Sequence, residues 1–492
     1  MFETPQRLHP AAIIIKLGTY FVEIFKQFAI PFAAVIFTSL KDSHGRAPLY
    51  IALAFAAIGA ISVLRAVLHF LSTNYVIRDG SLIINNGFIW RKHRTIPLNR
   101  IQNVNIERTI WHKLLGAAAV KIETAAGKKT EGDLEALSLP NAERLEKLLL
   151  QSREQDDQAD PVAPPKPLYQ LNLRQVLLTG ALSNRAVYII ASTVAVLQSE
   201  GVRQGAEPVA KWASHLDPMM QFAYAVGGFL TLIVVGWLLS IVMSATRYYN
   251  FQIQKHEKGF LITNGLITQF RSVLPVGRIQ DLRVVQPLLY QAFGYTELYA
   301  DTAGSYNKHD TAAANKVCPL IPEGGVDHFG QMLLPEFSFE RLDWQRLSHR
   351  AIMLYTFSWI RAAVIFLCIP LGYWLHWNAF WALIPIAILA TIFGLVHYQV
   401  SGYAFTEDLV ASRHGVLRRE AIILPFDRIQ HFSTHSSFLQ RLFGVASVSA
   451  VSASSMSHAL GIGNVDQHAA DEIRRRIETS VQSHLGKRRA GL

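Results

Sequence analysis

Long apolar runs recur along the chain in three pairs, and each pair precedes a stretch of short segments that mix apolar and polar residues. The second run of each pair reaches the roughly 20 residues that cross the hydrocarbon core of a bilayer, whereas the first is shorter. Each shorter run follows a basic residue, Lys26, Arg185 or Arg361, whose long side chain can reach the headgroups. The six runs are residues 28–40, 49–71, 186–199, 222–243, 362–377 and 379–397. They predict three transmembrane helix hairpins.

Amphipathic segments precede the hairpins. Residues 11–27, 171–184 and 342–360 mix Leu, Ile and Phe with Lys, Arg and Gln at helical spacing, which predicts helices lying in the membrane interface. Buried helices of a soluble core are the alternative interpretation. It is disfavoured because six long apolar runs contain so few charged residues.

The connectors between the runs predict the orientation of the hairpins. The loop 200–217 carries three acids and two bases, and the connector around 376–378 carries no Lys or Arg. By the positive-inside rule, both termini and all large loops are therefore expected in the cytoplasm. The first connector, with Lys41, Asp42 and Arg46, fits this rule less well. The basic residues that define the cytoplasmic side are Arg174, Arg185, Arg247, Lys255, Arg346, Arg350 and Arg413.

A threefold repeat occupies the segments that follow the hairpins. The tripeptide Arg-Ile-Gln occurs at Arg100, Arg278 and Arg428. Each copy has a proline three residues before this arginine, a glycine thirteen residues before it and another glycine sixteen residues after it, with no insertion in between. Around the motif, short β-rich runs are broken by turn dipeptides such as Asn86-Gly87. The second glycine suits the left-handed end of a short helix.

Each copy is expected to end in a helix, over residues 141–151, 326–334 and 466–484, the second being short. Many short strands closed by a terminal helix favour a small, strongly bent sheet or barrel. The second copy is expected to depart from the others through extra residues around 255–258 and a longer loop over 304–314. The fold class predicted is thus membrane α-helical plus β, with three tandem units of a helix hairpin followed by a β-barrel.

The motifs Leu8-His9-Pro10, residues 424–430 and residues 438–444, with their equivalents in the other copies, resemble a known family. This is the bacterial membrane-flanked domain family, the YdbT/YdbS-like proteins with pleckstrin-homology-like (PH-like) domains, and the likeness covers nearly the whole chain. It implies a PH-like β-barrel capped by a C-terminal helix, and a place in the bacterial cytoplasmic (inner) membrane. It implies no catalytic activity, because the family has no established enzymatic chemistry.

The predicted domain organisation follows from the runs and the repeats. Each unit consists of an amphipathic helix, a transmembrane hairpin and a PH-like domain, and one linker, acidic and then Pro-rich, separates the first unit from the second. The segments are 1–73 (amphipathic helix and hairpin 1), 74–152 (PH-like domain 1), 153–170 (linker), 171–247 (amphipathic helix and hairpin 2), 248–336 (PH-like domain 2), 337–399 (amphipathic helix and hairpin 3) and 400–486 (PH-like domain 3).

Composition and motifs argue against an enzyme. Half the residues are apolar and 17% are charged, which suits a mixed membrane and globular protein. The net charge of +11 is explained by cytoplasmic basic residues or anionic headgroups, and no nucleic-acid partner is expected. Two distant cysteines, Cys318 and Cys368, provide neither a disulfide framework nor a zinc site. No Walker loop, dinucleotide fingerprint, nucleophile elbow or zinc helix occurs, so no cofactor, metal or catalytic residue is predicted.

Basic clusters on the repeats are candidates for contact with anionic lipid headgroups. A domain tethered next to the bilayer can bring such clusters to the surface, where each basic side chain contributes about 1 kcal/mol. A solvated face together with the cytoplasmic charge bias is the alternative. The candidates are Arg91, Lys92 and Arg94 in the first copy and Arg413, Arg418 and Arg419 in the third. The second copy offers only Arg271 nearby.

The repeated motif residues are candidates for either a structural or a ligand-binding role. An arginine at the start of a strand after a proline turn commonly bonds to carbonyls of a neighbouring turn or to a carboxylate. These residues are Arg100 and Gln102, Arg278 and Gln280, and Arg428 and Gln430.

The sequence therefore predicts a non-enzymatic multi-pass protein that presents three cytoplasmic PH-like domains as a scaffold for protein partners, anionic lipid headgroups or both. The expected partners are membrane lipids and a smaller membrane-flanked-domain subunit. A transporter or lipid-handling membrane protein is the alternative. It is disfavoured because the repeats run parallel, whereas secondary transporters commonly have inverted repeats.

Overall fold

The computed structural model divides the chain into two compact units. The first comprises Met1–Gln170 with Thr246–Leu274, and the second comprises Leu171–Ala245 with Pro275–Leu492. The second repeat is shared between them, so each unit is described by itself. The structure describes residues 4–20, 23, 47–87, 91–124, 132–151, 167–183, 185–197, 207–209, 211–256, 259–302, 316–365, 379–453 and 460–489.

In the first unit, a four-stranded antiparallel sheet opens the first repeat, in the order β1-β2-β3-β4. Its β2–β3 turn contains Asp79 and Gly80 with φ angles of 50° and 66°, the left-handed pair that a tight hairpin of twisted strands requires. The Asp-Gly dipeptide therefore predicts this turn correctly. The strands are β1 (Gln6–Arg7), β2 (Asn74–Arg78), β3 (Ser81–Asn86) and β4 (Lys92–Pro97).

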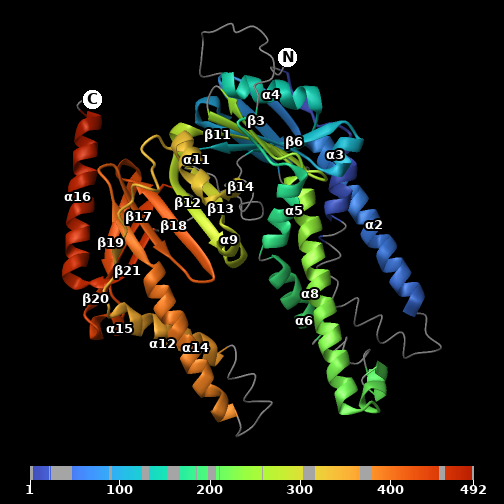
Figure 1. Ribbon diagram of the computed structural model, residues 1–492. Helices are drawn as coiled ribbons and strands as arrows, with labels where there is room; N and C mark the ends of the chain where they lie inside the picture. The colour runs from blue at the N-terminus through green and yellow to red at the C-terminus, as the bar shows by residue number, and fades with distance from the viewer. Residues whose placement is uncertain are drawn as a thin grey trace. The chain divides into compact units, whose positions relative to one another are not determined.

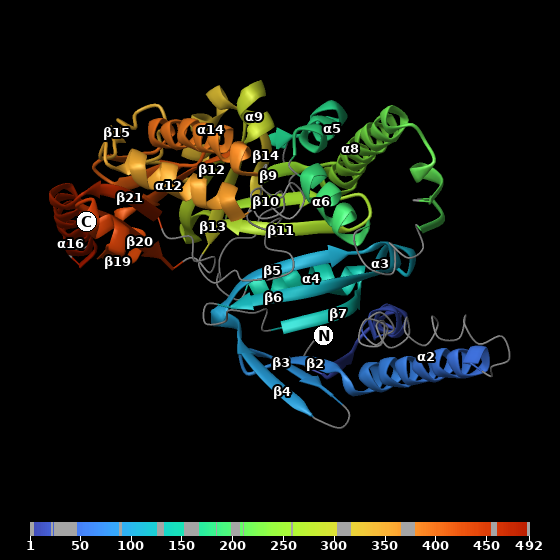
Figure 2. The same ribbon diagram turned by 90° about the horizontal axis from the view of Figure 1, so that it is seen from below.

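A seven-stranded sheet in the same unit combines two repeats, in the order β7-β6-β5-β11-β10-β9-β8. The later strands of the first copy and the earlier strands of the second copy join where β5 pairs antiparallel with β11 (Figure 2). We call this junction the first seam. The strands are β5 (Ile101–Arg108), β6 (Ala117–Thr124), β7 (Gly132–Ser138), β8 (Tyr169–Gln170), β9 (Gln252–His256), β10 (Gly259–Asn264) and β11 (Gln269–Pro275).

The core of the first copy lies between these sheets and the helix α4 (Leu139–Gln151), which packs on β5, β6 and β7. Leu82, Ile122 and Leu145 are fully buried in it, so truncating any of them to alanine should cost about 2–5 kcal/mol. The other helical elements of the unit are a helix at Ala11–Tyr20, α2 (Ala47–Ser72), η1 (Leu98–Arg100) and α3 (Ile110–Leu114).

The second unit repeats the same arrangement one copy further along. A seven-stranded sheet has the order β14-β13-β12-β18-β17-β16-β15, and β12 of the second copy pairs antiparallel with β18 of the third at what we call the second seam. The strands are β12 (Ile279–Pro287), β13 (Tyr295–Thr302), β14 (Lys316–Pro322), β15 (Gln345–Arg346), β16 (Gly402–Phe405), β17 (Leu409–His414) and β18 (Arg418–Pro425).

The third copy ends in a three-stranded sheet, β19 (Ile429–His435), β20 (Val445–Ser452) and β21 (Leu460–Asp466), in the order β19-β20-β21. The helix α16 (Gln467–Arg489) packs along it, as Figure 1 shows. Ala470, Ile473 and Ile477 of α16 are buried in the core of this copy. The remaining helical elements are α5 (Leu173–Leu182), α6 (Arg185–Leu197), α8 (Pro218–Tyr248), η2 (Val276–Arg278), α9 (Leu288–Phe293), η3 (Glu323–Gly325), α11 (Val326–Leu333), α12 (Ala351–Ala363), α14 (Ala379–Val400), η6 (Phe426–Arg428) and α15 (Phe438–Leu442).

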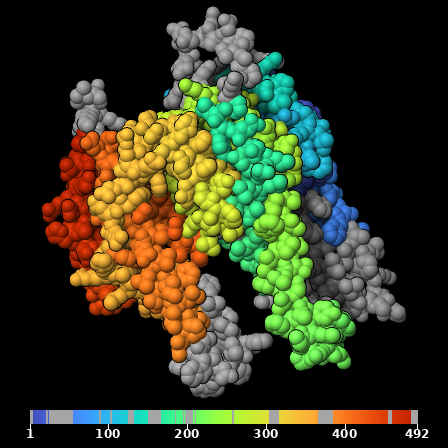
Figure 3. Space-filling view, viewed as in Figure 1, coloured from blue at the N-terminus to red at the C-terminus, as the bar shows by residue number. Residues whose placement is uncertain are grey.

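Two of the described helices are long and apolar enough to cross a membrane, Phe55–Ser72 and Pro218–Tyr248. A shorter apolar helix, Ile384–Val400, stands at the corresponding place in the third copy. Figure 1 shows α14 extending beyond the strands that follow it, and the orange atoms of this part of the chain project in the same way in Figure 3. The predicted run 28–40 and most of the run 362–377 lie outside the described residues. The prediction of three complete hairpins therefore stays a prediction.

Small residues recur at equivalent positions of the helices that precede the strands. The position 38 residues before each motif arginine holds Ser62, Ser240 or Ala390, all buried. The position four residues later holds Ala66, Ser244 or Gly394. Small residues at this spacing let helices pack closely. In the second copy the approach is tight, because Ser240 Oγ donates 3.0 Å to the carbonyl of Gly180 on α5, and a Cβ on Gly180 would lie 2.6 Å from Ile241 Cα.

Three expectations need correction. The described strands form four open sheets and no closed barrel, because backbone groups at the edge of one repeat are satisfied by the next repeat rather than within a barrel. The second copy has no extra residues around 255–258, since β9 and β10 lie at the same distances from the motif arginine as β2 and β3. The helix predicted over 342–360 begins only at Ala351, because Gln345–Arg346 forms β15. The terminal helices are confirmed as α4, α11 and α16.

Candidate anion-binding site

A half-open pocket of about 290 Å³ lies at the first seam. Its walls come from β5, β9, β10, β11 and α4, and its rim includes Tyr249 and Asn250, the two residues that follow the last residue of α8. The pocket therefore lies next to the end of a helix that is long and apolar enough to cross a membrane.

Two arginines line the pocket from the two strands of the seam. Arg108 on β5 faces Gln269 on β11, and Arg271 on β11 faces Ile106 on β5. Because side chains two residues apart on a strand share a face, Arg108 and Arg271 lie on the same face as diagonal neighbours, with Cα atoms about 7–8 Å apart. Both Nε atoms are buried and have no hydrogen-bond partner in the described part of the chain. A buried guanidinium N–H without a partner favours an anionic acceptor.

Acidic residues near the pocket only partly neutralise the arginines. Glu143 of α4 lines the pocket and is exposed. Glu146, one helical turn further on, is buried, and burial raises the pKa of its carboxyl, while the charge of Arg271 opposes that rise. Glu146 is not among the residues that line the pocket, although its carboxyl interacts with Arg271. The pocket wall carries two arginines against one exposed glutamate, so its charge favours an anion.

The pocket is held to the end of α8 by three hydrogen bonds from the β10–β11 turn. The Asn264 side chain donates to the Arg247 carbonyl at 2.9 Å, the Gly265 N–H donates to the Tyr249 carbonyl at 2.9 Å, and the Leu266 N–H donates to the Thr246 carbonyl at 2.8 Å. Gly265 has a φ of +107°, which a residue with a Cβ rarely adopts. The turn thereby satisfies carbonyls at the helix end and fixes the distance between helix and pocket.

The structure places the predicted headgroup residues of the first copy elsewhere. Arg91, Lys92 and Arg94 are exposed on or next to β4, and β4 has only β3 as a neighbour among the described strands. Lys92 and Arg94 face Asn86 and Ile84 on β3. These residues form a basic sheet edge, and none of them lines the pocket.

The predicted headgroup residues of the third copy belong to the second unit. Arg418 and Arg419 lie on β18 opposite Pro287 and Gln286, and Arg418 is 3.8 Å from the carboxylate of Glu420. Arg413 is half-buried, with its guanidinium 4.5 Å from the ring centre of Trp344. Burial lowers the pKa of Arg413, and the charge of Arg419 adds to that effect. Stacking and burial leave Arg413 less available to a headgroup than an exposed arginine.

The motif residues occupy equivalent places but make different contacts. Each motif arginine ends a short 3-10 turn that leads into β5, β12 or β19. Arg428 pairs with Asp427 at 3.2 Å and donates 3.2 Å to the carbonyl of Gly277 in the preceding copy. Arg100 is exposed, and Arg278 is half-buried. Gln280 is buried and donates to the Arg278 carbonyl at 3.2 Å, Gln430 is exposed, and the side chain of Gln102 lies outside the description.

A buried charge cluster at the second seam was missed by sequence reasoning. Arg283 Nε lies 2.9 Å from Asp301 Oδ2, and Arg283 Nη1 lies 3.4 Å from Glu420 Oε1 across the seam. Asp281 accepts a 3.0 Å hydrogen bond from Ser452, and burial, followed by the charge of Asp301, raises the pKa of its carboxyl. The available signal was the charged pair at alternate positions of one strand, Asp281 and Arg283, which the other copies lack.

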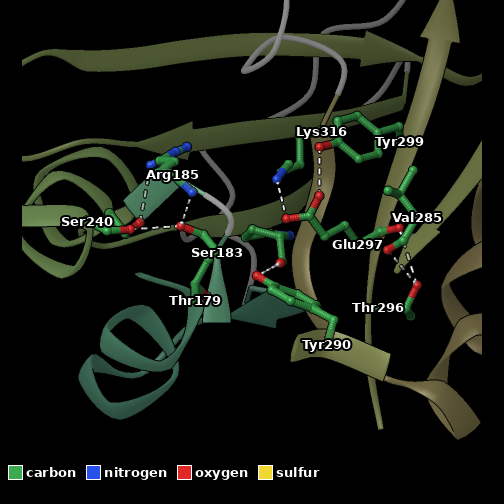
Figure 4. Close-up of polar contacts among 12 residues, drawn as sticks. Thr179, Ser183, Arg185, Ser240, Val285, Tyr290, Thr296, Glu297, Tyr299 and Lys316 are labelled. Carbon is green, nitrogen blue, oxygen red and sulfur yellow. Dashed lines mark hydrogen bonds and ion pairs between the residues drawn. The ribbon is translucent and has the colours of Figure 1, made fainter. Parts of the chain in front are cut away.

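A second buried ion pair lies on the same sheet. Lys316 Nζ is 2.7 Å from Glu297 Oε1, and the Tyr299 hydroxyl donates 2.8 Å to the other carboxylate oxygen of Glu297 (Figure 4). Lys316 and Glu297 are both less than a tenth exposed. These charges are paired with each other within the sheet, so neither is available to a ligand.

Catalytic and metal chemistry finds no support in the described residues. Among them, no group of three or more His, Cys, Asp or Glu side chains could hold a metal ion. Asp281 and Asp301 are each 1% exposed, so a substrate could not reach them. Cys318 is buried, and burial raises the pKa of its thiol, which makes it a poor nucleophile.

Comparison with known proteins adds two findings. The family model described as bacterial PH domain matches three segments, residues 24–153, 218–321 and 353–481, which together cover more than half of the chain. The chain is also 25% identical, over 494 aligned residues, to the UPF0699 transmembrane protein YdbT of Bacillus subtilis (strain 168). That alignment covers 96% of this chain and 97% of the relative. The two findings agree with the threefold repeat and with the membrane-length helices.

Proposed function

The chain belongs to the bacterial PH domain family, and from this premise we propose that it is a non-enzymatic, multi-pass protein of the bacterial inner membrane that binds anionic lipid headgroups and serves as a scaffold. The observation that carries the lipid part is the pair of arginines, Arg108 and Arg271, whose buried Nε atoms line a pocket directly beyond α8.

Three features support the membrane part of the proposal. Two described helices are long and apolar enough to cross a bilayer, and the relative that aligns along nearly the whole chain is named a transmembrane protein. Small residues at the same two positions of α2, α8 and α14 suit close packing of helices in lipid. The cytoplasmic orientation of both termini rests on the bias of basic residues in the sequence.

The chemistry of the pocket supports an anionic headgroup. Guanidinium groups form paired, charge-assisted hydrogen bonds with phosphate oxygens, and two of them on one face match a phosphodiester better than a single lysine would. Tyr249 and Asn250, which line the pocket, directly follow the last residue of α8. A phospholipid of the same leaflet would reach it with its headgroup while its acyl chains stay in the bilayer.

The composite sheets support the scaffold part of the proposal. Both seams join consecutive copies by strand pairing, so the PH-like domains are tied to each other as well as to their helices. A ladder of backbone hydrogen bonds resists separation more than side-chain contacts between separate domains do. Such an array would present the surfaces of all three copies in a fixed order.

Native mass spectrometry of the full-length chain in neutral detergent tests the lipid part. With phosphatidylglycerol or phosphatidylcholine added, the wild-type chain should retain phosphatidylglycerol selectively. The double variant Arg108→Gln/Arg271→Gln should retain it at least 10-fold more weakly, because each basic side chain contributes about 1 kcal/mol and 1.4 kcal/mol is a factor of ten. Inorganic phosphate in a parallel titration distinguishes a headgroup from free phosphate as the ligand.

The variant Arg91→Gln/Lys92→Gln is the matched control, because it removes the same charge from the exposed β4 edge. We expect it to retain phosphatidylglycerol as the wild type does. If this control loses the lipid and the pocket variant keeps it, the edge cluster is the headgroup site. Equal retention of both lipids by all variants would contradict a headgroup role.

A further inference from the structure

The two seams have the same register relative to the repeat. At the first seam Arg108, eight residues after its motif arginine, faces Gln269, nine residues before the next motif arginine. At the second seam Gln286 faces Arg419 at the same two positions of their copies. Because two separate seams have the same register, each copy pairs with the next copy in the same way.

The seams also share a side-chain contact. Thirteen residues after its motif arginine, Lys113 donates to the carbonyl of Leu266 in the next copy. Its counterpart Gln291 donates to the carbonyl of Val416 at 3.0 Å, and Leu266 and Val416 stand at the same position of the following copies. At both seams, a long side chain on the short helix of one copy thus donates a hydrogen bond to the hairpin turn of the next copy.

The motif arginine itself crosses the second seam. Arg428 of the third copy donates to the carbonyl of Gly277, the residue before the motif arginine of the second copy. At this seam the motif arginine therefore links its own copy to the preceding copy. It gives Arg428 a structural role and assigns it no ligand.

The chain begins and ends with edges that have no seam partner among the described strands. β4 of the first copy is the counterpart of β11 and β18, but its one neighbour in the described part is β3. β19 of the third copy is the counterpart of β5 and β12, and there its one neighbour is β20. The two edges are therefore the two complementary halves of a seam.

We propose that β19 of one chain pairs antiparallel with β4 of a second copy of the same chain, in the register of the two internal seams. The pairing places Thr434 opposite His93, as Ile106 stands opposite Arg271 and Val284 opposite Ala421. It is heterologous, because each chain contributes a different edge, so chains can add in sequence. The inference extends the proposed scaffold role and does not depend on lipid binding.

Side chains at both edges suit a second copy. Arg100 is exposed on the first copy, and the residue it would meet, by the precedent of Arg428 and Gly277, is Asp427 of the second chain. The Asp427 carboxylate, which lies 3.2 Å from Arg428 of its own chain, stands beside that carbonyl. Arg441 is exposed on α15 at the position of Lys113 and Gln291, so it is a long donor for the turn that precedes β4 of the second chain.

Disulfide crosslinking of full-length chains in native membranes tests the pairing. Residues directly opposite on antiparallel strands have Cβ atoms about 4.5–5.5 Å apart, within reach of a disulfide bond after modest adjustment. Two populations are co-expressed, one carrying His93→Cys and the other Thr434→Cys. We expect linked dimers in the mixture, none with either variant alone, and ladders from a chain that carries both substitutions.

The matched control moves one cysteine by a single residue. Ser433→Cys with His93→Cys points the new thiol to the other face of the strand, so its linked yield should fall at least several-fold. Dimers from His93→Cys alone or Thr434→Cys alone would show like edges pairing and overturn the proposal. So would equal yields from matched and shifted pairs, or no linked product from the matched pair.

A charge variant separates the side-chain contribution from strand pairing. In the crosslinking mixture, Arg100→Glu should lower the dimer yield several-fold, because it would set a carboxylate against Asp427 of the second chain. Arg78→Glu makes the same charge change on an exposed residue of the same copy and should leave the yield unchanged. Equal effects of the two variants would contradict the contact between Arg100 and Asp427. The crosslinking result and the lipid-retention result can fail independently.

Discussion

The two seams join the same elements in the same register, but they differ in how their buried arginines are paired. The first seam leaves the Nε atoms of Arg108 and Arg271 without a hydrogen-bond partner in the described structure, beside a half-open pocket. The second seam buries Arg283 with the carboxylates of Asp301 and Glu420. One backbone arrangement thus supports a surface suited to binding an anion and a junction whose arginine is paired with two carboxylates. Sequence differences between the copies, rather than the fold of the repeat, decide which of these two arrangements forms at a given seam.

The largest difference between the seams is expected on removing an arginine. Arg283→Ala leaves two carboxylates buried without their cation, which typically costs about 3–5 kcal/mol. Arg271→Ala removes a side chain without a hydrogen-bond partner at its Nε atom, so the cost should stay below about 1 kcal/mol. Thermal unfolding of the full-length chain in detergent measures both. Equal destabilisation would contradict the difference between the seams.

The pH dependence of stability should sharpen the same comparison. Burial raises the folded-state pKa of Asp281 above its ordinary value of 3.8, so the stabilising contribution of its neutral form is complete below that pH. The contribution is lost as the pH rises through the folded-state pKa. Asp281→Asn should therefore flatten the fall in stability at higher pH and change little near pH 4. The free energy of unfolding would be measured from pH 4 upward through the folded-state pKa of Asp281. If it falls equally steeply in the wild type and in Asp281→Asn, a raised pKa is contradicted.

A smaller effect is expected for two serines that link consecutive copies. Ser452 is buried and donates 3.0 Å to Asp281, whereas Ser272 donates 2.7 Å to Asn105 across the first seam from a half-buried position. Ser452→Ala should cost about 1–2 kcal/mol and Ser272→Ala about 0.5–1 kcal/mol, because a buried acceptor left unsatisfied is the more costly. Chemical unfolding would rank the two variants, and the reverse order would show the first seam to be the tighter.

The smallest effect should come from the donors of the short helices. Gln291→Ala removes the hydrogen bond to the Val416 carbonyl, and Lys113→Ala removes its counterpart at the first seam. Each is expected to cost about 0.5–1 kcal/mol. Hydrogen exchange at the β10–β11 and β17–β18 turns measures the loss locally. A larger loss elsewhere in the chain would assign these side chains another role.

Much of the local structure could be predicted from the sequence, because the signals are local. The Asp79-Gly80 turn, the left-handed Gly294 after α9 and the apolar periodicity of α4 depend on neighbours in the sequence. The spacing around the motif arginines likewise predicted three equivalent copies. Closed barrels were the wrong extrapolation, since nothing in a single copy shows whether its edge strand pairs within that copy or with the next.

The candidate pocket could not be predicted in the same way. The sequence offers Arg271 as the one basic residue near the corresponding hairpin of the second copy, but its neighbour Arg108 comes from another copy and becomes a neighbour only through the pairing of β5 with β11. The charge cluster of Arg283 could not be predicted for a similar reason, because Glu420 comes from the third copy. Sites built across repeats need the pairing between repeats to be known first.

Pairing of consecutive copies is tested most directly by an intrachain disulfide at the second seam. Gln286 and Arg419 face each other across β12 and β18, so Gln286→Cys/Arg419→Cys in native membranes should yield the linked peptide in mass spectrometry after oxidation. The shifted pair Gln286→Cys/Glu420→Cys, whose side chains point to opposite faces, should stay reduced. Linkage of the first pair alone is the expected result. Absence of that linkage, or equal linkage of both pairs, would contradict a composite sheet in this register.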